Sequence, residues 1–232
     1  MPLPKLETPT YKITIPSTGA STVFRPFLVK EHKILLTLAE ADELEISRVI
    51  TDLIDACTFN KLRMDELSNF DIEYLFLMLR AKSIGETMDL VLTCENCKEK
   101  NDVTVNLLNA KIDKQENHSN KIKIGDDITI ILNYPRFEDV LKLFQNGSEV
   151  DTFDLVVKSI KSIYTSDESY DAKDQSYEEL SDFVNSMSKD QFDKLENFFL
   201  TMPKLVQSIE KDCEKCGHHN KVVLEGLQNF FV

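Results

Sequence analysis

Tryptophan is absent from this sequence of 232 residues, which also contains only six glycines and four histidines. So few glycines argue against a glycine-rich phosphate-binding loop. The common motifs of nucleotide-binding proteins, hydrolases and zinc proteases are also missing. The histidines stand in uninformative contexts, and the spacing of the many carboxylates singles out no pair for acid–base catalysis. We therefore expect a non-catalytic structural or assembly protein that has no small-molecule substrate.

Positive charge is scarce as well: the sequence has 27 Lys and Arg but 40 Asp and Glu, which gives a net charge of −13. Nucleic acids and anionic membranes both attract basic proteins, so we expect neither as a partner. The longest apolar runs, such as residues 74–79, are far shorter than the roughly 20 residues of a membrane-spanning helix. The N-terminus lacks the apolar core of a signal peptide, which favours a reducing compartment.

The first part of the chain has clear periodicities. Residues 11–15 and 22–28 alternate like the strands of a hairpin around the turn-like segment 16–19, and a helical stretch begins near Val29. An apolar stripe predicts a second helix over residues 43–57, which ends at Cys57, a small buried hydrophobe. A third helix, apolar over most of its surface, is expected over residues 69–82 with Ser68 as its cap.

The spacing of apolar residues then changes from helical to strand-like, and it later becomes helical again. Residues 88–93 and 102–107 read as strands, and residues 122–132 as a hairpin. Helices are expected from residue 137, and strands at 205–209 and 221–224. Local signals predict where the helices of this block begin and end. They are an apolar stripe from Phe153 to Tyr164 with Asp151 as cap, a polar loop over 166–175, capping boxes at Ser176/Glu179 and Ser188/Gln191, and a helix stop at Pro203.

The helical block is also strongly acidic. Residues 137–202 include 15 acidic and 6 basic side chains, so they account for −9 of the net charge of −13. A charged helix face is usually only solvated, but this excess also suits an acidic docking surface for a partner.

Four of the five cysteines form two Cys-x-x-Cys pairs, Cys94 with Cys97 and Cys213 with Cys216, and each pair lies between two predicted strands. Such a turn, a zinc knuckle, can aim both sulfurs at one point. Tetrahedral Zn²⁺ takes four ligands at about 2.3 Å, so two knuckles supply one site. Thiolates favour zinc or iron–sulfur over Mg²⁺ or Ca²⁺. We predict one structural zinc bound by the four cysteines, with an iron–sulfur centre as the alternative.

Disulfides or a redox role for the two pairs are the other interpretations. A reducing compartment argues against disulfides, and a redox Cys-x-x-Cys normally opens a helix, whereas strand formers flank both pairs here. Four thiolates leave no open position for water, which argues against catalytic zinc. His218 and His219 follow the second pair, where one of them could replace a cysteine or donate a hydrogen bond to the site, unless both are exposed polar residues.

The two pairs are separated by 115 residues, whereas compact zinc ribbons commonly have about 15–20 between theirs. A shared metal therefore implies an insertion between two halves of a ribbon. We predict an α+β chain of five parts: an extended proline-rich arm (1–10), a hairpin with helices (11–86), the first half of a zinc ribbon with an added β-hairpin (87–136), an inserted acidic helical block (137–203), and the second half of the ribbon with a C-terminal tail (204–232).

Both ends of the chain carry longer recognisable segments: ITIPST at 13–18, FRPFLVKE at 24–31 and CEKCGHHNKVVLEGLQNFF at 213–231. They resemble the baseplate hub assembly proteins of T-even-like contractile-tailed bacteriophages, over roughly the first 40 and the last 20 residues. The resemblance implies a role in building the central hub of the tail baseplate. Its partners would be other baseplate and hub proteins, in the virion tail or in the host cytoplasm during assembly.

Candidate partner-binding residues lie near both ends. The arm and an aromatic tail with Phe230 and Phe231 suit strand or pocket contacts with neighbouring proteins. Arg25 and Phe27, between the first hairpin and the first helix, are candidates for contact or for a purely structural role. Two other functions stay open: a zinc-ribbon regulatory or adaptor module that binds a cellular protein or nucleic acid, and a dithiol oxidoreductase.

Overall fold

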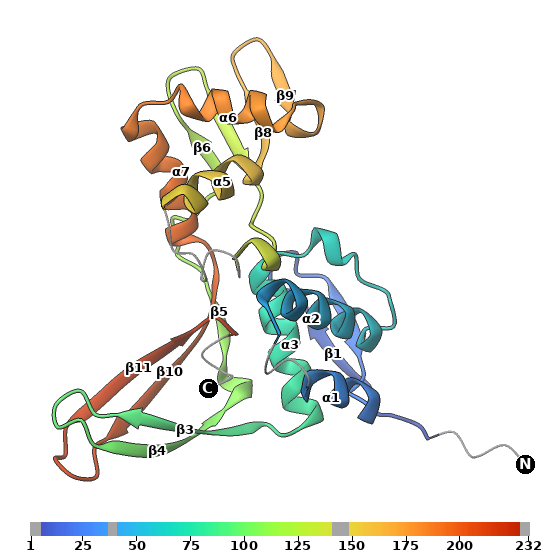
Figure 1. Cartoon of the computed structure of the whole chain (residues 1–232), viewed down its shortest axis with the longest axis vertical. Helices are drawn as coiled ribbons and strands as arrows, with labels where there is room; N and C mark the ends of the chain where they lie inside the picture. The colour runs from blue at the N-terminus through green and yellow to red at the C-terminus, as the bar shows by residue number, and fades with distance from the viewer. Residues whose placement is uncertain (1–5, 37–40, 141–148, 228–232) are drawn as a thin grey trace, which may run out of the picture. The chain divides into compact units, whose positions relative to one another are not determined.

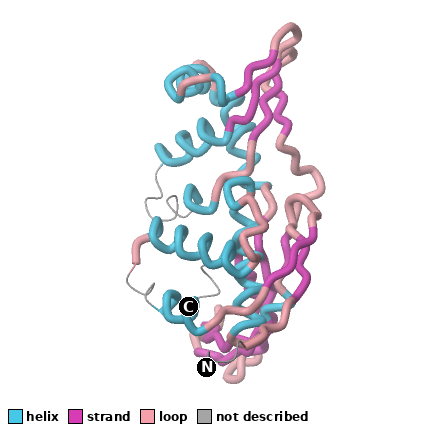
Figure 2. Tube along the Cα trace, turned by 90° about the vertical axis from the view of Figure 1, so that its right-hand side faces the viewer, coloured by secondary structure: helices cyan, strands magenta, loops and turns pink. Residues whose placement is uncertain are grey.

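The computed structural model describes residues 6–36, 41–140 and 149–227 (Figure 1). The chain divides into two compact units, one formed by Met1–Asp113 with Lys204–Val232 and the other by Lys114–Pro203. Both units contain helices and strands, which Figure 2 distinguishes by colour. This mixed content agrees with the expected α+β class.

The described residues of the first unit form three separate small sheets and three α-helices. Strands β1 and β2 form one hairpin, β3 and β4 form another, and β10 pairs with both β11 and β5, all antiparallel. Its elements are β1 (Tyr11–Thr14), β2 (Ser21–Phe24), α1 (Val29–Leu36), α2 (Glu43–Cys57), the 3₁₀ turn η2 (Met64–Glu66), α3 (Asn69–Ser83), β3 (Thr87–Thr93), β4 (Lys100–Asn106), the 3₁₀ turn η3 (Leu107–Asn109), β5 (Lys111–Asp113), β10 (Lys204–Asp212) and β11 (His219–Glu225). The predicted helices and strands of this unit are present, but the second strand of the first hairpin ends at Phe24 and not at Leu28, and β10 extends to Asp212.

Helix α3 lies at the centre of the first unit. Ser68 caps it as predicted: its hydroxyl accepts from the Asp71 N–H, and the Asp71 carboxylate accepts from the Ser68 N–H. The same carboxylate accepts the N–H of Ser17 at 2.9 Å, which joins the turn of the first hairpin to the start of α3. Helix α3 packs against α2, β5 and β10, so its apolar residues are buried on nearly every side.

The second unit is a four-stranded antiparallel sheet in the order β6-β7-β8-β9, with helices packed on one face (Figure 1). Its elements are β6 (Lys121–Lys123), β7 (Thr129–Leu132), α5 (Glu149–Ser159), β8 (Ile160–Tyr164), β9 (Ser169–Asp171), the 3₁₀ turn η4 (Ala172–Asp174), α6 (Tyr177–Asn185) and α7 (Lys189–Thr201). Both predicted capping boxes, at Ser176 and Ser188, are present. The core of this unit consists of buried apolar side chains from β7, α5, β8, α6 and α7.

Three expectations within this block are wrong. Ile160 and Ile163 belong to strand β8 instead of extending a helix, because this segment pairs with β7 on one side and β9 on the other. Asp151, expected just before a helix as its cap, lies within α5. The loop expected over residues 166–175 contains β9 and η4.

The boundary of the second unit also differs from the expected one. The unit begins at Lys114, well before residue 137, because the hairpin β6–β7 pairs with β8 through Ile130 and Ile163. This hairpin thus belongs to the same unit as the later helices, whereas the cysteine-bearing strands belong to the other unit.

The two ends of the chain are only partly described. Residues 6–10 of the predicted arm are exposed and have no regular secondary structure. Residues 1–5 of the arm and the tail with Phe230 and Phe231 lie outside the described residues.

A buried glutamate links α3 to the end of β11. Glu73 is 7% exposed, and its carboxylate accepts the backbone N–H of Leu227. Gly226, in the left-handed conformation that favours glycine, lies next to this carboxylate, and its N–H donates to the Leu205 carbonyl at 2.9 Å. Burial raises the pKa of Glu73 to about 7, although the bond from Leu227 opposes this shift.

The raised pKa predicts a pH-dependent stability. Because the folded chain holds the Glu73 proton up to about pH 7 and the unfolded chain releases it near its ordinary pKa of 4.5, this group lowers the free energy of unfolding as pH rises between these values. We expect Glu73→Gln to match the wild type below pH 4.5 and to be more stable at pH 8, by about 3 kcal/mol. Urea denaturation at both pH values measures this.

The exposed Glu45→Gln on α2 is the matched control and should behave like the wild type at both pH values. If Glu73→Gln and the wild type were equally stable at pH 8, the ionised Glu73 carboxylate would not lower the free energy of unfolding as we expect.

Candidate metal centre

Two hairpins, β3–β4 and β10–β11, each carry one Cys-x-x-Cys pair at their turn. In the first, the N–H of Cys94 donates to the Glu99 carbonyl at 2.8 Å, and the N–H of Lys98 donates to the Cys94 carbonyl at 3.0 Å. Lys98 has φ of 61°, the left-handed conformation that closes the turn just after the second cysteine. This tight turn places both thiols on the same side of the hairpin end.

The second turn is built in the same way. The N–H of Cys213 donates to the His218 carbonyl at 2.9 Å, and the N–H of Gly217 donates to the Cys213 carbonyl at 2.9 Å. Gly217 has φ of 69°, and glycine adopts this conformation without steric cost.

The four predicted ligands come together at the ends of these hairpins, which lie side by side in Figure 1. The sulfurs of Cys94, Cys97, Cys213 and Cys216 all lie within 4.8 Å of one another. The Cys94–Cys216 sulfur distance is 3.8 Å, and the Cys97–Cys213 distance is 3.6 Å. Neither histidine that follows the second pair belongs to this group; the Nδ1 atom of His219 lies 2.7 Å from an Asp212 carboxylate oxygen instead.

These distances suit four ligands of one ion. In a regular tetrahedron with metal–sulfur bonds of about 2.3 Å, neighbouring sulfurs are ~3.8 Å apart. A disulfide needs about 2.05 Å, and all five cysteines are free thiols. The donor set and its spacing therefore fit a single tetrahedral metal ion.

The pKa values of three of the clustered thiols are shifted, and not all in the same direction. Backbone N–H groups of the turns, first that of Cys216, lower the pKa of Cys213 to about 6 against the effect of burial. The N–H of Cys97 likewise lowers the pKa of Cys94. For Cys97, the N–H of Glu99 also lowers the pKa, but burial and the other three thiols raise it to about 12. Thiolates held so close together would repel one another, and a bound cation would offset this repulsion.

Two asparagines next to the cysteines were not identified from the sequence. The Nδ2 atom of Asn101 lies 3.7 Å from the Cys213 sulfur, and its Oδ1 accepts the N–H of Glu214 at 2.9 Å. Asn220 accepts the N–H of Glu95 at 3.0 Å. Each asparagine follows the first cysteine of its own pair by seven positions, and this repeated spacing is the signal by which the sequence could have indicated them.

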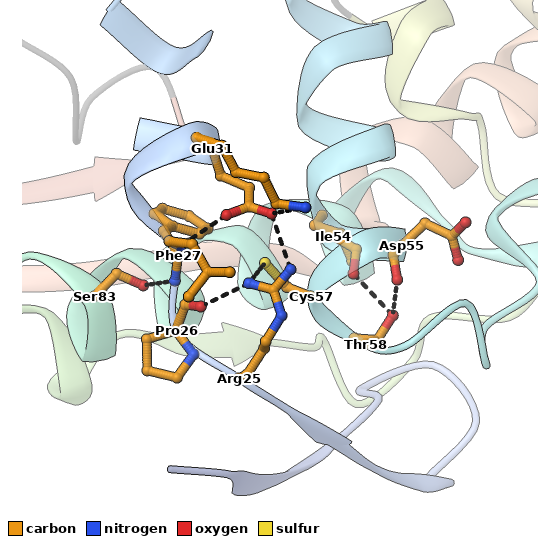
Figure 3. A network of polar contacts seen from close by, with 11 residues as sticks. Arg25, Pro26, Phe27, Glu31, Ile54, Asp55, Cys57, Thr58 and Ser83 are labelled. Atoms are coloured by element: carbon orange, nitrogen blue, oxygen red, sulfur yellow. Dashed lines mark hydrogen bonds and ion pairs between the residues drawn. The ribbon is translucent and has the colours of Figure 1, made fainter. Parts of the chain in front are cut away.

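Arg25 lies inside a polar network that joins three segments of the first unit (Figure 3). Its side chain is 11% exposed and pairs at 2.9 Å with Glu31, whose side chain is 6% exposed. The guanidinium also donates to the Pro26 carbonyl at 3.0 Å and approaches the Cys57 sulfur at 3.7 Å. Burial raises the pKa of Glu31, but the bonds from Arg25 and the Leu28 N–H outweigh it and lower that pKa overall. Arg25 therefore fixes the segment before α1 against the end of α2.

Phe27 and Cys57 have internal roles in the same region. The N–H of Phe27 donates to the Ser83 hydroxyl at 2.8 Å, and its ring packs against that of Phe76 with centroids 6.0 Å apart. Cys57 is fully buried, which confirms it as a core residue, and burial raises the pKa of its thiol to about 11. Direct partner contact by Arg25 and Phe27 stays a prediction.

His118, for which the sequence predicted no role, forms hydrogen bonds that connect distant segments of the second unit. Its Nδ1 lies 3.0 Å from the Thr201 hydroxyl and its Nε2 lies 3.1 Å from the Tyr134 hydroxyl. Because the Thr201 hydroxyl donates to the Asn197 carbonyl at 2.8 Å, it accepts from Nδ1–H of His118. Burial, with help from Lys114, lowers the pKa of His118. The histidine thus joins both ends of this unit as a neutral hydrogen-bonding group.

Within the described ranges, no helix has both the length and the apolar character needed to cross a membrane. No solved structure is significantly similar to the chain. Among curated proteins, the chain is similar to the baseplate hub assembly protein gp26 of Enterobacteria phage T4. The two are 25% identical over 207 residues, which cover 89% of this chain and 90% of that protein.

A family model agrees with this similarity and extends it. The model described as "T4 bacteriophage base plate protein" matches residues 8–232, which includes all four clustered cysteines and both units of the fold. Since the match spans nearly the whole chain, the chain belongs to the T4 bacteriophage base plate protein family.

Proposed function

We propose that this protein is a non-catalytic component of a phage tail baseplate that acts in the central hub region through contacts with other baseplate proteins. The observation that carries the proposal is the similarity, over nine-tenths of both chains, to a protein named for baseplate hub assembly. Membership of the base plate family supports the same role. The acidic composition and the lack of catalytic motifs agree with a structural part.

We further propose that Cys94, Cys97, Cys213 and Cys216 hold a structural Zn²⁺. Thiolates are soft ligands, and four of them complete the tetrahedral shell of zinc and leave no position for water or substrate. The two hairpins would then form a split, zinc-ribbon-like pair, with the second unit inserted between its halves. Bound zinc would act as a crosslink between distant parts of the chain; a mononuclear iron centre with the same four sulfurs is the less favoured occupant.

Metal analysis tests this site directly. Purified protein should contain close to one zinc per chain, and Cys94→Ser should lose it and unfold at lower temperature, because it leaves three thiolates without their fourth partner. Cys57→Ala is the matched control: it opens a cavity in the core and lowers stability, yet it should retain the zinc. Mass spectrometry of metals together with thermal unfolding gives both readouts, and wild-type protein without zinc or iron would contradict the proposal.

Acid should release the metal. Zinc binds thiolates, so protons compete with it, and affinity should fall steadily as pH falls from 7 to 4. Released zinc can be followed with a coloured chelator. Zinc that stays bound at pH 4 in the presence of the chelator would argue against a site made only of cysteine thiolates.

A genetic experiment tests the role in the tail. If the gene is interrupted in the phage that encodes it, complete baseplates should be missing from lysates viewed by electron microscopy, and supplying the wild-type chain should restore them. Normal tails without the protein would contradict the proposed function.

The same assay tests the aromatic tail. We propose that Phe230 and Phe231 contact a neighbouring protein, so the double change to alanine should abolish rescue by the supplied chain while its zinc content and melting temperature stay unchanged. Full rescue by this variant would exclude the tail as a required contact. Arg25 and Phe27, which have internal partners, would affect assembly by positioning the segment before α1.

A further inference from the structure

The two cysteine hairpins repeat one pattern in sequence and in strand pairing. Both read Cys-Glu-x-Cys-x-x-x-Asn, over residues 94–101 and 213–220, so each residue of the first has a counterpart 119 positions later. Strand register repeats at the same offset: the pairs run from Thr87–Asn106 to Thr93–Lys100 in one hairpin and from Val206–Glu225 to Asp212–His219 in the other. The turn hydrogen bonds and the left-handed residues Lys98 and Gly217 match as well. The hairpins are therefore two copies of one local structure.

Contacts between the hairpins are reciprocal under this offset. The close sulfur pairs are Cys94–Cys216 and Cys97–Cys213, so the first cysteine of each hairpin faces the second cysteine of the other. Reciprocity of this kind characterises interfaces with twofold symmetry between identical subunits. Here the two copies belong to one chain.

The hydrogen bonds of Asn101 and Asn220 are reciprocal under the same offset. Oδ1 of Asn101 accepts the N–H of Glu214, which follows the first cysteine of the opposite hairpin, and Oδ1 of Asn220 accepts the equivalent N–H of Glu95. Within its own hairpin, each Nδ2 donates to the equivalent turn carbonyl: Asn101 to Glu99 at 3.1 Å and Asn220 to His218 at 3.0 Å. Each amide thus connects its own turn with the turn of the other hairpin.

The chemistry of this position requires an amide. Asn101 and Asn220 are both 3% exposed, so their polar atoms have exchanged water for these partners. The side chain must accept from one turn and donate to the other, which neither aspartate nor an apolar side chain can do. Loss of the acceptor would leave a backbone N–H next to a cysteine without its bond.

We infer that the metal centre is built from two equivalent half-sites and that Asn101 and Asn220 are its positioning residues, each holding the cysteine turn of the opposite hairpin in the geometry that binds metal. The inference rests on the proposed metal site for its function. Neither turn is then set by its own hairpin alone, and the four sulfurs are aligned only when the hairpins dock on each other. Groups that orient metal ligands in this way typically contribute 10–100-fold to metal affinity.

The test uses the full chain with Asn101→Ala and Asn220→Ala, and it measures amide hydrogen exchange by NMR. The expected pattern is crossed: Asn101→Ala should speed exchange at Glu214 and leave Glu95 protected, whereas Asn220→Ala should speed exchange at Glu95 and leave Glu214 protected. A general loss of stability would speed both. Asn96→Ala is the matched control, since its exposed amide approaches the Cys216 sulfur at 3.7 Å but has no bond to the opposite backbone, and it should leave both amides protected.

Zinc affinity, measured by competition with a chelator, is the second readout. Each single variant should bind zinc about 10–100-fold more weakly than the wild type, and the two losses should be similar because the half-sites are equivalent. Uncrossed exchange, or unchanged zinc affinity in both variants, would overturn the inference while leaving the zinc proposal intact. Wild-type protein that binds no metal would overturn the zinc proposal and the positioning role, and the crossed exchange pattern would then decide whether the paired half-sites exist.

Discussion

The first unit depends on the meeting of two hairpins that are far apart in the chain. Hairpin β3–β4 is a two-stranded sheet, and such a sheet is at best marginally stable in water by itself. Its cysteines meet those of β10–β11 across 115 intervening residues. Closing so long a segment costs entropy, and a shared metal would offset that cost by removing conformations from the unfolded chain. The second unit can then occupy the intervening segment as a compact fold with its own core.

Other contacts of the first unit extend this arrangement. Helix α3 provides an apolar centre against which β5 and β10 pack, and Glu73 on the same helix binds the end of β11. The Arg25–Glu31 pair holds the segment before α1 against the end of α2. A chain that works in an assembly through surfaces, as we propose, needs such fixed positions for the segments that lead to its two ends.

Local sequence signals predicted much of this fold. Helix α2 followed from its apolar periodicity, and α3 from an apolar segment that begins just after the cap Ser68. The capping boxes at Ser176 and Ser188 marked helix starts because those bonds form within four residues. The clustering of four cysteines followed from their paired spacing and is confirmed by the sulfur distances. Nothing in the local pattern distinguished the helix α5 from the strand β8 that follows it, since Ile160 and Ile163 continue the helical spacing and only pairing with β7 makes them a strand.

The features that sequence reasoning missed depend on partners distant in the chain. Asn101 and Asn220 acquire their roles from bonds to the opposite hairpin, and His118 from the far end of its unit. The metal site that we propose consists of four thiolates, two from each hairpin, around one ion. X-ray absorption at the zinc edge of the purified protein tests it most directly. We expect four sulfur neighbours at about 2.3 Å and no nitrogen or oxygen ligand. A shell with fewer than four sulfurs, or with oxygen from water, would contradict the four-thiolate site.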